Sequence, residues 1–304
     1  MEYEFRRITP TDVPDICRLF SASFNSELSE QALTRKLDTK DFGAAYVGYL
    51  AIAPNSEIAA YYAVYPVRMR INDTLVLAAQ SGDTMTHPEH QKKGLFLQLA
   101  ELCYQLAEQQ GIQLVFGFPN QNSKPGFIKH LQWQLLRPME GLELHASVPA
   151  WRRRFARWTH NPDAKVWARM QPLVVSDGLS FDDASDGVLK DQTYLGYKAS
   201  ITQSVVINYG PLTVWCIPGL RIDIGAFTEN QTLASEELRD AFIQLMQFSG
   251  AHSARFCMNP QSEAFAKLSP HGVSGSPVDV GYRLLDDSLT IRDLYFTRGD
   301  FDYF

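Results

Sequence analysis

The hydrophobic pattern of the first half changes repeatedly between a strand-like and a helix-like period. Apolar runs rich in β-branched and aromatic residues predict strands over residues 3–8, 45–53, 57–71, 75–86, 112–118 and 133–145. Helices are predicted over residues 9–24, 31–37, 94–110 and 123–131. In the longest helix, Leu95, Leu99 and Leu106 fall on one face. This order predicts an α/β (α+β) fold in which helices cover a mixed, largely antiparallel sheet.

A fainter copy of this order follows in the second half. The pattern predicts two strands and two helices over residues 220–227, 235–248, 252–258 and 261–268. The local sequence repeats as well, because Phe-Pro-Asn-Gln at 118–121 is echoed by Met-Asn-Pro-Gln at 258–261. A weak internal duplication is the economical interpretation.

Residues 148–172 differ in composition from the segments on either side. They include Trp-Arg-Arg-Arg-Phe-Ala-Arg-Trp at 151–158. Basic residues between tryptophans fit single-stranded nucleic acid or a membrane surface, but an amphipathic connecting helix is the simpler interpretation. We therefore predict a first domain over 1–147, a connecting helical segment over 148–172 and a second α/β domain over 173–304.

Composition and charge narrow the class of protein. Apolar residues make up 45% of the 304 residues and charged residues 20%, as in ordinary globular chains. The net charge of −6 lacks the basic excess of duplex nucleic-acid binders. The longest apolar run has about ten residues, whereas a membrane-spanning helix needs roughly 20. Because residues 1–5 do not resemble a secretory signal, we expect a cytoplasmic protein that binds neither nucleic acid nor membranes.

The four cysteines, Cys17, Cys103, Cys216 and Cys257, lie far apart in the sequence and form no Cys-x-x-Cys pair. No histidine stands near them at the spacing of a zinc site. We predict buried free thiols and no metal site.

The stretch from Ser81 to Phe96 carries the clearest chemical signal. It reads Ser-Gly-Asp-Thr-Met-Thr-His-Pro-Glu-His-Gln-Lys-Lys-Gly-Leu-Phe, a predicted strand that leads through a short loop into the amphipathic helix. Unpaired amides and the positive dipole end of a helix favour an anion, and Lys92 and Lys93 add positive charge. The spacing of a Walker or Rossmann loop is absent. The residues alone predict a phosphate or pyrophosphate site.

The same residues resemble the GNAT superfamily of acyl-CoA-dependent N-acyltransferases. The resemblance rests on Pro88, on Gln-Lys-Lys-Gly at 91–94 with the helix that follows, and on segments 115–120 and 127–133. It covers about residues 3–145. It implies that the pantetheine arm of acetyl-CoA lies between the strands at 75–86 and 112–118, with the loop amides on the pyrophosphate. The cofactor-binding residues that it implies are Met85, Gln91, Lys92, Lys93, Gly94, Leu95, Phe96 and Asn120.

Two positions depart from the family pattern. The family loop ends in Gly or Ala where this chain has Phe96, whose bulky side chain is expected to crowd the phosphates. Many members place a tyrosine on the next short helix to protonate the departing thiolate, and Phe127 or Ile128 stands there instead. Because a thiol has a pKa of roughly 8.5, the thiolate can leave without a strong acid, which predicts a different acid or none.

The reaction also needs a base, because an amine with a pKa of about 10 must lose a proton before it attacks a thioester carbonyl. Asp83, on the strand beside the predicted cleft, is the candidate base, with a structural carboxylate as the alternative. His87 is a second candidate, although a His-Pro pair at a strand end also fits a turn. Resemblance suggests that amides near Met85 polarise the carbonyl and hold the oxyanion.

The second half lacks the glycine loop. Its counterpart at 228–234, Thr-Glu-Asn-Gln-Thr-Leu-Ala, has no glycine at the helix start and an acid instead of lysines. We predict a degenerate GNAT-like domain that binds no CoA and shapes the acceptor cleft. The Arg-Gly-Asp tripeptide at 298–300 is interpreted as a turn.

The sequence therefore predicts an N-acetyltransferase that moves an acetyl group from acetyl-CoA to the primary amine of a small molecule. The whole-chain layout is similar to GNAT proteins found with polysaccharide biosynthesis, which implies an amino sugar as acceptor. Three alternatives stay open: an aminoacyl-tRNA-dependent transferase of the same tandem fold, a non-catalytic acyl-CoA-binding regulator and a protein-lysine acetyltransferase.

Overall fold

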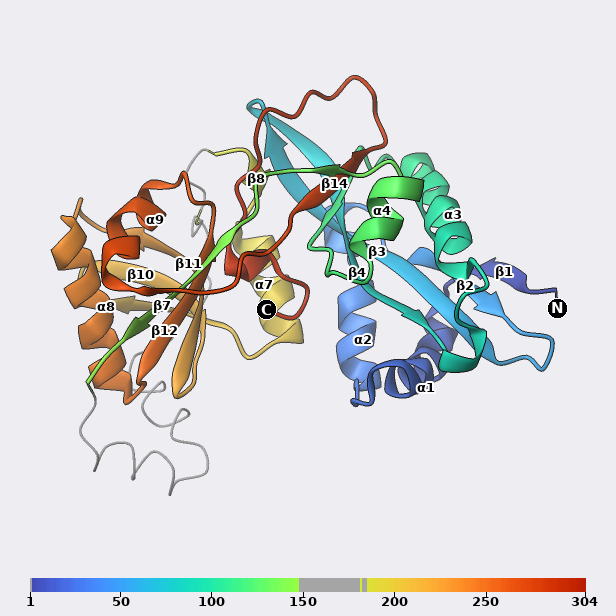
Figure 1. Cartoon of the computed structure of the whole chain (residues 1–304), viewed down its shortest axis with the longest axis horizontal. Coiled ribbons are helices and arrows are strands. Elements are labelled where there is room, and N and C mark those ends of the chain that lie inside the picture. Colours follow the sequence, from blue (N-terminus) through green and yellow to red (C-terminus); the bar gives the residue numbers. More distant parts are fainter. Residues whose placement is uncertain (1, 148–180, 182–184) are drawn as a thin grey trace. The chain divides into compact units, whose positions relative to one another are not determined.

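The computed structural model describes residues 2–147, 181 and 185–304, which fall into two compact units (Figure 1). The first unit consists of Met1–Leu136, Asp186–Leu189 and Asp279–Leu294. The second consists of Arg137–Ser185, Lys190–Val278 and Tyr295–Phe304. The connecting segment predicted at 148–172 lies outside the described residues.

The first unit is built on one sheet. Its strands run in the order β1, β2, β3, β4, β5, β14, β6, and β8 pairs with β3. All of these pairs are antiparallel except β4 with β5. The strand bounds are β1 (Glu4–Arg7), β2 (Val47–Ile52), β3 (Ile58–Ile71), β4 (Thr74–Thr86), β5 (Leu114–Gly117), β6 (Gln134–Leu135), β8 (Gly187–Val188) and β14 (Gly281–Leu284).

Helices cover both faces of this sheet. They are α1 (Val13–Phe24), α2 (Glu30–Leu37), α3 (Leu95–Gln109) and α4 (Lys124–His130). On one face, Tyr61 and Met85 share a buried cluster with apolar residues of α1 and α2. On the other face, Tyr62 is buried with Leu99 of α3 and Phe127 of α4. The sheet therefore presents successive residues of β3 to different helical layers.

The second unit repeats this plan. Its strands run in the order β13, β7, β12, β11, β10, β9, and only β11 and β12 are parallel. Leu238, Phe242 and Leu245 of α8 are buried in its core. The predicted α/β (α+β) fold class, with a second half built on the same plan as the first, is therefore confirmed. The elements are α7 (Gln192–Ile201), α8 (Ser235–Ser249), α9 (Glu263–Leu268), β7 (Glu140–His145), β9 (Val205–Tyr209), β10 (Leu212–Ile217), β11 (Arg221–Glu229), β12 (Ser253–Met258) and β13 (Val273–Ser274).

The chain exchanges strands between the two sheets. β7 comes soon after β6 in the sequence but pairs with β12 and β13 of the second sheet. β14 returns from the second half to lie between β5 and β6 of the first sheet (Figure 1). The compact units thus differ from the predicted linear boundaries, since 137–147 belong to the second unit and 279–294 to the first. Periodicity identifies a strand but does not specify its partner.

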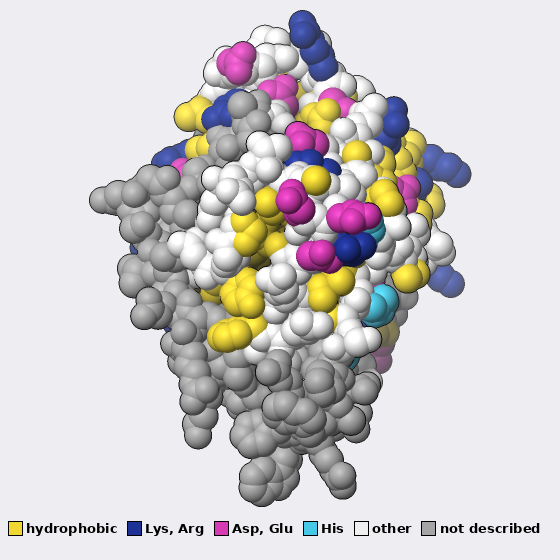
Figure 2. Space-filling model, turned by 90° about the vertical axis from the view of Figure 1, so that its left-hand side faces the viewer, with side chains coloured by type: hydrophobic (Ala, Val, Ile, Leu, Met, Phe, Trp, Pro, Cys, Tyr) yellow, Lys and Arg dark blue, Asp and Glu magenta, His cyan; other side chains and the backbone are white. Residues whose placement is uncertain are grey.

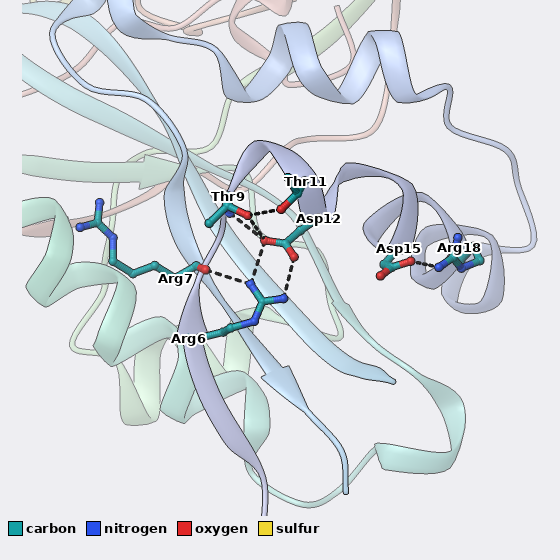
Figure 3. Close-up of polar contacts among 7 residues, drawn as sticks. All are labelled: Arg6, Arg7, Thr9, Thr11, Asp12, Asp15 and Arg18. Atoms are coloured by element: carbon teal, nitrogen blue, oxygen red, sulfur yellow. Dashed lines mark hydrogen bonds and ion pairs between the residues drawn. The ribbon is translucent and has the colours of Figure 1, made fainter. Parts of the chain in front are cut away.

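A buried carboxylate ties β1 to the segment that opens α1 (Figure 3). The Asp12 side chain accepts hydrogen bonds from Arg6 Nη1 and Nη2, at 2.9 and 2.6 Å, and from the Thr9 amide at 2.8 Å. These bonds, chiefly those from Arg6, lower the pKa of Asp12 to about 2. Nearby, Asp15 and Arg18 form an ion pair between exposed side chains.

The lowered pKa predicts a pH-dependent contribution of Asp12 to stability. A carboxylate whose pKa is depressed on folding stabilises the fold above its unfolded pKa of about 3.9, and the effect is lost as the pH falls towards 2. We expect Asp12→Asn to lower the free energy of unfolding by about 1–2 kcal/mol at pH 7, allowing for the half-exposed Arg6. Urea titrations between pH 7 and pH 3 measure this difference, which should shrink as the pH falls. Asp15→Asn is the matched control, and an equal loss in both variants would contradict the account.

Candidate active site

The start of α3 offers free backbone amides in an exposed loop. Lys92 and Gly94 have left-handed φ values of +61° and +76°, and residues 91–94 are exposed. Among the described residues, no side chain caps the start of α3. The first amides of a helix have no hydrogen-bond partner within the helix, and the positive end of the helix dipole lies there as well. Both features of α3 lie at this loop. The geometry suits a phosphate group, as the sequence predicts.

A cavity of about 440 Å³ lies beside this loop. The predicted residues Met85, Gln91, Phe96 and Asn120 all line it. The structure adds residues that the sequence analysis missed, from the end of α1, from β4 and from the β5–α4 loop and α4: Ser23, Phe24, Thr84, Thr86, Asn122, Ser123 and Gly126. No sequence signal connects the end of α1 with β4, because the two meet only through tertiary packing.

The strands β4 and β5 separate beside the cavity. Their parallel pairing ends at Gln80 with Phe116, while β4 continues to Thr86. Beyond the separation, β4 contains a bulge, because Asp83 and Thr84 together lie opposite Tyr62 alone. The two strands therefore separate, and the last three residues of β4, Thr84, Met85 and Thr86, line the cavity.

The predicted loop residues have different roles in the structure. The Lys93 ammonium lies 5.8 Å from the Tyr3 ring centroid, while Lys92 is exposed. Leu95 is buried in the core, so its backbone amide is the group left to contact a ligand. The carboxamide oxygen of Asn120 accepts hydrogen bonds from the Asn122 and Ser123 amides, at 2.9 and 3.0 Å, which organises the turn before α4.

Phe96 lies against the helices rather than over the loop. Its ring centroid is 5.2 Å from that of Phe127 and 5.9 Å from that of Tyr62. A side-chain carbon placed on Gly126 would come within 2.9 Å of the Phe96 ring. The large Phe96 ring on α3 is thus accommodated because residue 126 on α4 has no side chain. The crowding of the phosphates by Phe96 stays a prediction.

The helix that carries a tyrosine in many family members carries a buried phenylalanine here. Phe127 is 5% exposed and packs on Trp133. Hydroxyl groups are present deeper in the sheet, where Tyr62 bonds Tyr104 at 2.7 Å and Ser81 at 2.9 Å. Burial raises the pKa of Tyr62 and of Tyr104, so both phenols stay protonated at neutral pH.

The two candidate bases lie outside the cavity lining. The Asp83 carboxylate pairs with Lys36 and accepts a hydrogen bond from the Tyr65 hydroxyl at 2.8 Å. His87 Nδ1 accepts a hydrogen bond from the Glu89 amide at 3.3 Å, at the start of a short 3-10 helix. His87 therefore occupies the turn position that the sequence analysis gave as its alternative role.

The second unit has carboxylates where the first has a free helix start. Glu237 accepts a hydrogen bond from the Ala234 amide at 2.8 Å, and Glu229 accepts one from the Leu233 amide at 2.7 Å. Figure 2 views the molecule from the side of α8 and shows carboxylate side chains gathered near the middle of this face. The two amides just before α8 are therefore already bound to carboxylates.

In the second unit, side chains fill the space at the point where the parallel pairing of β11 with β12 ends. The pairing of β11 with β12 ends at Asp223, which binds Arg255 and Arg298. Next to it, a side-chain carbon on Gly225 would come within 2.5 Å of the Phe304 ring. The predicted turn at 298–300 is confirmed as a short 3-10 helix, and all three of its residues are buried.

The described residues contain neither a metal-binding cluster nor a membrane-spanning helix. These residues contain no group of three or more His, Cys, Asp or Glu side chains that could hold a metal ion. The same part of the chain contains no helix that is both long and apolar enough to cross a bilayer. All four cysteines are free; three are buried and Cys17 is half-buried.

Comparison with known proteins agrees with this geometry. Residues 4–136 match the family described as Acetyltransferase (GNAT) domain. This match covers most of the first unit, and the GNAT acetyltransferase fold supports N-acetyltransferase activity in general. No curated protein matches the sequence.

Solved structures resemble both units together. A GCN5-related N-acetyltransferase from Kribbella flavida has a TM-score of 0.63 and 13% identity, over 94% of this chain and 71% of that chain. A putative acetyltransferase from Pyrococcus horikoshii has a TM-score of 0.57 and 12% identity, over 96% and 92%. A glucosamine N-acetyltransferase region of a fungal multi-domain beta-N-acetylglucosaminidase has a TM-score of 0.55 and 11% identity, over 93% and 38%. At these identities the likeness concerns the fold.

Proposed function

We propose that this chain is a cytoplasmic N-acetyltransferase that transfers the acetyl group of acetyl-CoA to the primary amine of a small molecule, with an amino sugar as the favoured acceptor. One observation carries the proposal: the uncapped start of α3 lies beside a cavity that the bulged end of β4 also lines. This arrangement supports an anion site next to the backbone of β4, as a phosphate-bearing thioester would need.

In this proposal the backbone performs most of the binding. The amides from Gly94 to Leu97 hold the pyrophosphate, and Lys92 and Lys93 supply positive charge. The pantetheine arm lies between β4 and β5. Amides of β4 near Met85 donate to the thioester carbonyl and to the oxyanion that forms when the amine attacks.

The covalent step balances without a metal or a redox partner. The amine nitrogen forms a bond to the acetyl carbon, the carbon–sulfur bond breaks, and the amine proton passes to water. CoA leaves as a thiolate, whose pKa of roughly 8.5 allows it to depart without a strong acid. The absence of a tyrosine at Phe127 is therefore compatible with turnover.

The part of the cavity lining outside the predicted cofactor residues supports an acceptor held by hydrogen bonds rather than by ion pairs. None of these described residues is charged; they carry hydroxyl and carboxamide groups together with the ring of Phe24. Hydroxyl and amide side chains match the hydroxyl groups of a sugar, and an aromatic ring can cover its apolar face. A polycationic acceptor would call for carboxylates instead.

Release of free CoA thiol tests this function. Purified protein is mixed with acetyl-CoA and, separately, with glucosamine, other amino sugars, polyamines and a lysine-containing peptide library. We expect thiol release with at least one amino sugar, and the mass of its acetylated product confirms the transfer. Release with peptides only would indicate a protein-lysine acetyltransferase. Binding of acetyl-CoA without release to any amine would indicate a regulator.

A further inference from the structure

The bulge of β4 has an unusual backbone conformation. Pairing with β3 shifts from Tyr61 with Met85 to Ala63 with Gly82, which leaves Asp83 in the bulge. Asp83 has a φ of +48°, in the left-handed region that costs energy for any residue other than glycine. Such strain persists only where the surroundings hold it, and it tends to occur at functional sites.

The surroundings that hold Asp83 come from β3 and from α2. Its Oδ2 atom accepts hydrogen bonds from Lys36 Nζ and from the Tyr65 hydroxyl. The Lys36 ammonium lies 4.9 Å from the Tyr65 ring centroid, and Lys36 is only 7% exposed. A buried ammonium needs a carboxylate partner, so this ion pair fixes the Asp83 side chain firmly.

The residues after Asp83 face the cavity, whereas its carboxylate does not. Thr84, Met85 and Thr86 line the cavity, while Asp83 and Lys36 are absent from its lining. Asp83 is thus poorly placed to take a proton from an amine there. Its side chain is well placed to set the direction of the peptide groups that follow it.

We propose that Asp83 is a positioning residue: Lys36 and Tyr65 fix its carboxylate, the carboxylate holds the left-handed bulge, and the bulge aims the β4 peptide groups on either side of Met85 at the thioester carbonyl. This inference rests on the proposed function. It replaces the role of general base that the sequence suggests for Asp83.

Two substitutions at Asp83 separate these roles. Glycine adopts a positive φ without strain, whereas alanine does not, and both remove the carboxylate. If Asp83 positions the bulge, Asp83→Gly should keep kcat within about tenfold of wild type and Asp83→Ala should lose about 100-fold. If Asp83 is the base, both should lose about 10²–10⁴-fold, and the acidic limb of the pH–rate profile should disappear.

Substitution of the partner lysine gives an independent comparison. Lys36→Met should lower kcat at least about tenfold, with the KM for acetyl-CoA and the shape of the pH profile unchanged, because the loop at 91–94 is untouched. Lys40→Met is the matched control, since Lys40 forms an exposed ion pair with Asp38. Equal kcat values for Lys36→Met and wild type would overturn the proposal, as would an altered pH profile.

Amide hydrogen exchange decides the inference even when turnover fails. If wild-type protein releases no thiol with any amine, the proposed function is wrong, while the positioning role still predicts faster exchange at residues 84–86 in Lys36→Met than in wild type or Lys40→Met. Equal exchange in all three proteins would overturn the positioning role.

Discussion

Replacement of Gly94 by valine is expected to abolish the stabilisation that acetyl-CoA gives to this protein. Ligand at about 100 times its dissociation constant adds roughly 2.7 kcal/mol to the free energy of unfolding, which corresponds to a rise of several degrees in melting temperature. Gly94 has a φ of +76°, so a β-branched residue distorts the loop that the proposal assigns to the pyrophosphate. Thermal unfolding with and without saturating acetyl-CoA measures the effect.

Gly111 supplies the matched control at the other end of the same helix. Its φ of +79° is nearly equal, and a side-chain carbon there would meet nothing within 4 Å. Gly111→Val should therefore lower the melting temperature by a similar amount while it keeps the shift with acetyl-CoA. Loss of the shift in both variants, or in neither, would show that the loop at Gly94 is not the anion site.

The second large effect concerns the exchanged strand. We expect residues 1–137 alone to show no cooperative unfolding, because without β14 the strands β5 and β6 have no ladder between them. Leu135 pairs with Gly281, and the Leu136 amide bonds the Val280 carbonyl at 3.0 Å. An Asn-Gly turn joining residues 1–137 to residues 279–294 should therefore restore a folded unit, since this dipeptide favours two-residue hairpins. Circular dichroism during thermal unfolding distinguishes the two proteins.

A proline in β14 tests whether the added strand acts through its ladder. Tyr282 pairs with Phe116 on one side and Gln134 on the other. Tyr282→Pro in the fused protein removes a backbone donor from a central strand, so it should abolish cooperative unfolding again. A sharp transition in residues 1–137 alone, at the same midpoint as in the fusion, would contradict the strand exchange.

Local features were predictable because they depend on neighbouring residues. The pattern predicts a helix over 94–110, and α3 spans Leu95–Gln109. Four residues that line the cavity were also predicted, Met85, Gln91 and Phe96 from the glycine loop and its two flanking elements and Asn120 from the segment at 115–120. These residues belong to segments whose hydrophobic period and polar side chains can be recognised from neighbouring residues alone.

Contacts between distant segments were not predictable in the same way. The pairing of Lys36 with Asp83 joins residues that are far apart in the sequence, and the sequence around either residue does not predict its partner. The same holds for β7 and β14, because an alternating pattern predicts a strand but does not predict to which sheet the strand belongs. Phe96 illustrates a third case, because the space for its ring depends on the glycine at 126.

The stoichiometry of acetyl-CoA binding tests the central claim most directly. The exposed glycine loop at the start of α3 predicts a site in the first unit, whereas the segment before α8 lacks such a loop and its Leu233 and Ala234 amides already bind Glu229 and Glu237. Calorimetric titration of the full chain with acetyl-CoA should therefore give one molecule bound per chain, and none in Gly94→Val. Two bound molecules would contradict the contrast between the units, and no binding by the wild-type chain would contradict the site itself.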